Sequence, residues 1–108
     1  MRAADEIGAI RDALARLEQE GSDMSSPMTL DFFVAVPNRE VGEVVSARVK
    51  ALGFRTSVER DSDGDWTCYC TKVLIPTLAT VIATENELDR LAEDVGGYVD
   101  GFGSLGNA

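Results

Sequence analysis

Two cysteines, Cys68 and Cys70, could in principle form a disulfide, bind a metal ion or act as nucleophiles. Their spacing would place both thiols on the same face of a strand. There the Cα atoms lie near the upper distance limit for a disulfide and the side chains run parallel, which disfavours a bridge. A metal site would need further ligands, and the sequence contains no histidine. We therefore expect two small buried side chains and no metal at these positions.

Catalysis by an activated nucleophile is not supported by the sequence. Without histidine, no Ser–His or Cys–His pair can form. The nucleophile elbow Gly-x-Ser-x-Gly and the phosphate loop Gly-x-x-x-x-Gly-Lys are also absent. The carboxylates are spread over turns and helix surfaces, a pattern that is typical of solvated faces and not of an acid–base pair. We therefore expect a protein that is not an enzyme and that uses no cofactor.

The acidic segment from Asp61 to Asp65 resembles the start of a calcium-binding loop. Counted from Glu59, its acids and Gly64 fall at places one, three, five and six of an EF-hand loop, but place twelve, which needs a bidentate glutamate, is Cys70. The flanking segments alternate between apolar and polar residues, as strands do. The sequence therefore predicts a hairpin turn here and not a calcium site.

The segment Gly97–Gly103 carries the most specific combination of side chains. Read as a strand, it places Tyr98, Asp100 and Phe102 on one face and glycines on the other. Glycine is normally avoided inside a strand, so Gly101 implies a bulge or a close approach of another backbone. The segment is either a tightly packed edge strand or an aromatic–acidic patch that recognises a partner.

Lys72 is a lone base that follows a predicted strand beginning at Trp66. It either reaches along the sheet edge to solvent or contacts an acidic group at the end of the strand. The residues that we expect to bind a partner are Tyr98, Asp100, Gly101, Phe102, Trp66 and Lys72.

Predicted helices and strands position these residues. The chain has 108 residues, which is long enough for one domain. Apolar residues at three- and four-residue spacing predict helices over 3–20, 39–52 and 78–95. Alternation predicts strands over 28–36, 54–59, 66–71 and 98–105, and residues 73–76 are expected to leave the sheet.

The order of these elements predicts the fold class. After an N-terminal helix and linker over residues 1–27, residues 28–108 read as β-α-β-β-α-β. This is the ferredoxin-like pattern, an α+β sandwich with a four-stranded antiparallel sheet. Right-handed crossovers place both helices on one face of the sheet. The other face is left for the N-terminal helix, a partner subunit or solvent, so a homodimer stays open.

The charge balance excludes one class of partner. The net charge is −9, with 19 acids against 10 bases, whereas direct binding to nucleic acid needs a basic face. An acidic surface suits solubility or attraction to a basic protein. No apolar span approaches the ~20 residues of a transmembrane helix, and no secretory signal is visible, so we expect a cytoplasmic protein that does not bind membranes.

At Tyr98-Val99-Asp100-Gly101-Phe102-Gly103 the chain resembles the ribonuclease E inhibitor family, the regulators of ribonuclease activity of the B type. The family's C-terminal signature reads aromatic-x-Asp-Gly-Trp-Gly. The preceding helical segment Leu88–Glu93, the strand Asp65–Lys72 and the junction Glu20–Asp23 are similar as well. Phe102 departs from the signature, because it replaces the usual tryptophan and so removes an indole donor while keeping the bulk.

This resemblance implies protein–protein regulation. The domain would bind an endoribonuclease of the ribonuclease E type and damp its cleavage of RNA or remodel its complex. One alternative is a small-molecule-sensing, ACT-like domain with ligands at a dimer interface, by analogy of fold alone. Another is an acylphosphatase-like enzyme, for which Arg39 follows the first strand but no glycine-rich cradle precedes it.

Overall fold

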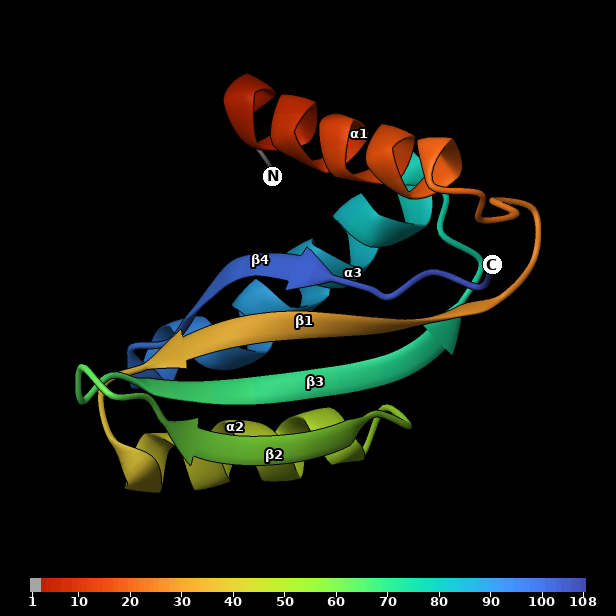
Figure 1. Ribbon diagram of the computed structural model, residues 1–108. Coiled ribbons are helices and arrows are strands. Elements are labelled where there is room, and N and C mark those ends of the chain that lie inside the picture. Colours follow the sequence, from red (N-terminus) through yellow and green to blue (C-terminus); the bar gives the residue numbers. More distant parts are fainter. Residues whose placement is uncertain (1–2) are drawn as a thin grey trace.

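The structure, a computed structural model, describes residues 3–108, and its elements follow the predicted order (Figure 1). No helix in this range is long and apolar enough to cross a membrane. The elements are α1 (Ala4–Gln19), β1 (Met28–Val36), α2 (Arg39–Lys50), β2 (Arg55–Arg60), β3 (Trp66–Leu74), α3 (Leu78–Ala92), the short 3-10 helix η1 (Glu93–Val95) and β4 (Tyr98–Gly103).

The four strands form one antiparallel sheet in the order β2-β3-β1-β4, which confirms the ferredoxin-like prediction. The central strand β1 pairs with β3 over all 9 of its residues. Its alternate residues Leu30, Phe32 and Val34 have no exposed surface, because they face the layer formed by α2 and α3 (Figure 1). The core therefore lies between the helices and one side of the sheet.

Strand β3 is longer than the sequence predicts. Val73 and Leu74 are expected to leave the sheet, but they pair with Thr29 and Met28. The expectation is wrong because the first residues of β1 need partners for their backbone hydrogen bonds. The chain also contains no strand-breaking residue between Trp66 and Pro76, so β3 can continue to Leu74.

Two helix N-termini are capped by polar side chains, which fixes where the chain turns after each strand. Asn38 Oδ1 accepts a hydrogen bond from the backbone N–H of Val41 at 2.9 Å, and Thr77 Oγ1 accepts one from Thr80 at 3.0 Å. Within α2, Gly42 allows a close approach to the sheet, because a Cβ atom there would lie 2.6 Å from Val58 Cγ1.

Helix α1 packs within the chain, against α3 and the helix-facing side of β4 (Figure 1). Its buried residues Ile10, Leu14 and Leu17 belong to the same core cluster as Phe32 and Leu88. A lone helix of this length is marginal in water, so this shared core is what holds it. The opposite face of the sheet is consequently left uncovered by the described residues.

The segment after β4 ties down the linker between α1 and β1. The side chain of Asn107 accepts a hydrogen bond from the backbone N–H of Asp23 at 2.7 Å and donates one to the Asp23 carbonyl at 2.9 Å. Ser104 Oγ donates to the carbonyl of Thr29 at 2.7 Å. These bonds hold the linker between α1 and β1 against the C-terminal segment.

Candidate functional site

The side of the sheet that faces away from the helices carries an unusual mixture of aromatic, hydroxyl and acidic side chains. We call it the open face, and it comprises alternate residues over 29–35 of β1, 55–59 of β2 and 67–73 of β3, with Tyr98, Asp100 and Gly103 of β4. Within residues 3–108 all helices lie on the other side (Figure 1). The open face is therefore available for contact with another molecule.

An aromatic pair occupies the centre of the open face. Phe33 of β1 lies directly opposite Tyr69 of β3, and their rings meet edge to face with centroids 5.6 Å apart and planes at 79°. On the other side of Phe33, a Cβ atom on Gly103 would lie 3.3 Å from the ring. Gly103 is thus the residue that lets the Phe33 ring extend over β4.

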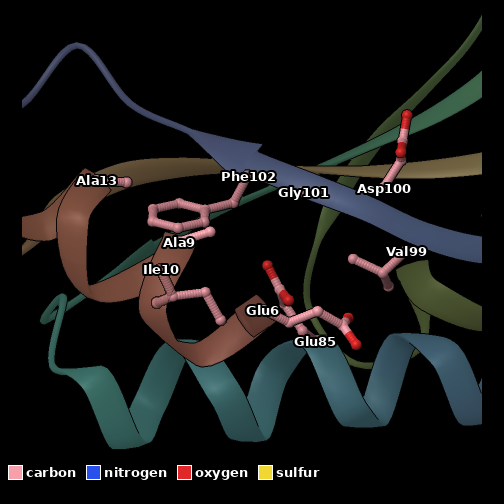
Figure 2. A pocket seen from close by; sticks show the side chains of 9 residues that line it. All are labelled: Glu6, Ala9, Ile10, Ala13, Glu85, Val99, Asp100, Gly101 and Phe102. Carbon is pink, nitrogen blue, oxygen red and sulfur yellow. The ribbon is translucent and has the colours of Figure 1, made fainter. Parts of the chain in front are cut away.

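A bulge in β4 changes which face its side chains occupy. The register between β1 and β4 shifts after Phe33, and Gly101 adopts a φ of +132°, a conformation that favours glycine. The bulge that Gly101 implied is confirmed. The prediction that Tyr98, Asp100 and Phe102 share one face is wrong, because the extra residue turns Phe102 toward the core while Asp100 points away from it (Figure 2).

A hollow of about 400 Å³ lies at the end of the open face, between the β2–β3 turn and the start of β4. We call it the acidic hollow. Three acidic and two aromatic residues contribute to its wall, and none of its lining residues is basic. Of the two aromatic residues, Tyr98 lies on the open face, whereas Trp66 pairs with Val36 and packs against the core. The lining residues are Ala35, Val36, Pro37, Asp61, Asp65, Trp66, Thr67, Gly96, Tyr98 and Asp100.

The β2–β3 turn, a hairpin turn as predicted, holds part of this wall in place. Asp61 Oδ1 accepts hydrogen bonds from the backbone N–H groups of Asp63 at 2.9 Å and Asp65 at 3.0 Å. Gly64 supplies the positive φ, +90°, that closes the turn. In the described part of the chain, no group of three or more acids or cysteines is arranged to hold a metal ion.

The six residues predicted to bind a partner do not form one cluster. Trp66, Tyr98 and Asp100 meet at the acidic hollow, and Tyr98 is 58% exposed. Phe102 instead packs on Phe32, with ring centroids 6.0 Å apart, and Gly101 serves the bulge. Half of the predicted set thus gathers at one place on the surface, and the other three residues lie elsewhere.

Lys72 is the clearest correction. It lies within β3 on the side of the helices, opposite Leu30, and not beyond a strand end. Its ammonium group donates to the carbonyl of Leu52 at 3.0 Å and sits 4.7 Å from the ring centroid of Phe54. Neither expected arrangement is found. The ammonium group instead donates to a carbonyl just past the end of α2, where carbonyl groups lack partners within the helix.

A second hollow, of about 350 Å³, lies beneath α1 on the core side of β4. Figure 2 shows Phe102, Ile10 and Val99 at its apolar wall, together with the side chains of Glu6 from α1 and Glu85 from α3. Its lining residues are Glu6, Ala9, Ile10, Ala13, Glu85, Val99, Asp100, Gly101 and Phe102.

Three residues of these surfaces, Glu85, Phe33 and Tyr69, are not predicted from the sequence. Glu85 is only 3% exposed, and the available signal was its place on the apolar stripe of α3 between Val81 and Leu88. Phe33 and Tyr69 are not among the residues that the sequence predicts to bind a partner. Their signal was two aromatic residues on the polar side of adjacent strands.

The two cysteines are buried in the core, as predicted. Both are fully buried, and their sulfur atoms are 3.9 Å apart. The hydrogen bond with Cys68, together with burial, raises the pKa of the Cys70 thiol. Because neither side chain has exposed surface, both thiols are shielded from reagents in the folded state.

We expect this protection to be measurable. In the folded protein, a thiol-reactive disulfide reagent should label Cys68 and Cys70 at least ~100-fold more slowly than in the same protein denatured in urea, because labelling must wait for unfolding. The readout is the absorbance of the released chromophore over time. Fast labelling of one thiol before any loss of circular dichroism would contradict the burial seen here.

The family model described as RraB, Regulator of ribonuclease activity B, matches residues 8–104. The chain belongs to this family. A search of the curated proteins found no match. The region matched to RraB includes most of α1, the whole sheet, the open face and the acidic hollow. The matched region therefore contains the whole sheet and all residues that line the acidic hollow.

Proposed function

We propose that this protein is a non-enzymatic regulator that binds an endoribonuclease of the ribonuclease E type and lowers its cleavage of RNA. The observation that carries the proposal is the RraB family match, which spans nearly all of the chain. The proposal places both proteins in the cytoplasm and assigns the effect to protein–protein contact, without a cofactor.

The charge of the domain supports a protein partner over RNA itself. The chain carries a net charge of −9, and the acidic hollow presents carboxylates with no base among its lining residues. Phosphate groups would be repelled from such a surface, whereas a basic protein segment would be attracted to it. A ribonuclease must itself bind RNA through basic residues, so an acidic domain can compete with RNA for them.

The test is a binding and cleavage assay with a purified endoribonuclease of this type. We expect this protein to bind it and to slow cleavage of a labelled RNA at about 0.05 M salt, and both effects to weaken markedly at about 0.5 M because the attraction is screened. Bovine serum albumin, another acidic protein, serves as the control for non-specific charge effects. A ribonuclease that is neither bound nor slowed at the lower salt concentration would contradict the proposal.

A further inference from the structure

We propose that the open face and the adjoining acidic hollow form one docking surface for an arginine-rich segment of the partner protein. This inference rests on the proposed function and adds to it the surface and the chemistry of the bound segment. In this arrangement one guanidinium group enters the acidic hollow and another stacks on the aromatic pair.

The first support is the position of the aromatic rings. Phe33 and Tyr69 lie side by side on the two central strands, and Tyr98 stands at the end of the same face. Four-stranded sheets of this topology can stack planar groups on such rings, as RNA-recognition domains do with bases. The neighbouring Gly103 has no side chain, which leaves the Phe33 ring free to be approached from the β4 side. The geometry thus suits a flat, delocalised group.

The second support is the negative charge around these rings, which favours a planar group that is positively charged. Asp31 on β1 and Glu59 on β2 belong to the open face, and Asp61, Asp65 and Asp100 line the acidic hollow. By the strand register, Arg55 is the one basic side chain of the open face within residues 3–108. A base attached to a phosphate backbone would be repelled here, whereas a cationic planar group would be attracted.

The third support separates arginine from lysine. The guanidinium group is planar, stacks on aromatic faces and donates to a carboxylate through two parallel bonds, whereas the lysine ammonium is a compact charge. The hollow offers the exposed side chain of Tyr98 together with separate carboxylates, which do not converge on a point of ionic size. Asp31 is already held by a hydrogen bond from Thr71 Oγ1 at 2.5 Å, so its carboxylate is oriented before binding.

The open face and the hollow are continuous. Thr67, Ala35 and Tyr98 form the last row of the open face and also line the acidic hollow. An extended segment can therefore contact both, with side chains of alternate residues directed to the same surface. A single folded patch of the partner is not required.

The experiment measures binding of a fluorescent peptide of alternating arginine and serine by anisotropy at low salt. The full-length protein is compared with Phe33→Ala, with the pair Asp65→Asn and Asp100→Asn, and with a control pair of equal charge change, Asp5→Asn and Asp12→Asn, on the exposed side of α1. We expect about a tenfold loss of affinity in the first two variants and less than about a twofold loss in the control. A peptide of alternating lysine and serine should bind several-fold more weakly.

Three outcomes would overturn the inference. The first is an equal loss in the hollow and control pairs, which would reduce the effect to overall charge. The second is binding of a single-stranded RNA that Phe33→Ala abolishes, which would make the open face an RNA platform. The third is a dimer in light scattering that Phe33→Ala dissociates, which would assign the surface to a second copy of the chain. Circular dichroism checks that each variant is folded.

The same variants separate this inference from the proposed function. If the ribonuclease is bound and slowed equally by the wild-type protein and both surface variants, the proposed function stands and the docking surface is wrong. If the wild-type protein does not bind the ribonuclease, the proposed function fails, whatever the peptide does.

Discussion

Phe32→Ala is expected to lower the free energy of unfolding by about 3–5 kcal/mol, which is a large part of the stability of a domain of this size. Phe32 has no exposed surface and packs at the centre of the core. Its ring contacts Phe54 edge to face at 6.4 Å and Phe102 at 6.0 Å between centroids. Removing it leaves a cavity that the paired strand β1 cannot close. Urea denaturation followed by circular dichroism measures the loss.

The matched control is the next residue. Phe33→Ala removes the same side chain from the opposite face of the same strand, where the ring is partly exposed and makes an edge-to-face contact with Tyr69. We expect Phe33→Ala to lower the free energy of unfolding by about 1 kcal/mol, and by less than about 2 kcal/mol in any case. Equal losses of stability in the two variants would mean that the two faces of the sheet are not buried as differently as the structure indicates.

Leu14→Asp is expected to detach α1 or to unfold the protein, with a loss of at least about 3 kcal/mol in the free energy of unfolding. Leu14 is 8% exposed and lies with Ile10 and Leu17 on the stripe that joins the common core. An unpaired carboxylate there cannot be solvated without moving the helix. Thermal denaturation measures the loss of stability, and limited proteolysis reports whether the linker after α1 becomes accessible.

Ala15→Asp provides the control for this variant. It adds the same charge one residue further along α1, but Ala15 is exposed, so we expect a change within about 0.5 kcal/mol. If Leu14→Asp were as harmless as Ala15→Asp, α1 would not belong to the core in solution, and the N-terminal helix would act as a separate element.

The sequence was sufficient for the architecture because its periodic patterns are strong and locally consistent. The strand predicted over 28–36 matches β1, and Asn38 and Thr77, whose side chains commonly cap helices, do so here. The end of β3 could not be predicted in the same way. Val73 pairs with Thr29 because of a long-range partner and not because of its neighbours in the chain.

The candidate site was harder to predict, because it depends on register. Tyr98, Asp100 and Trp66 were identified from residue type, but their meeting at one hollow requires the β2–β3 turn to lie beside the start of β4. The single extra residue at the β4 bulge reversed the face of Phe102. The contact of Lys72 cannot be predicted locally, because its partner, the Leu52 carbonyl, lies in a segment that no short-range pattern connects to it.

The irregularity of β4 also bears on how the protein avoids self-assembly. An exposed strand at the margin of a sheet offers unpaired amides and carbonyls to neighbouring molecules, which is a route to fibrils. Here Gly101 breaks the repeat on one margin, and on the other margin β2 carries Arg55, Glu59 and Arg60. Both margins thus discourage the addition of another strand.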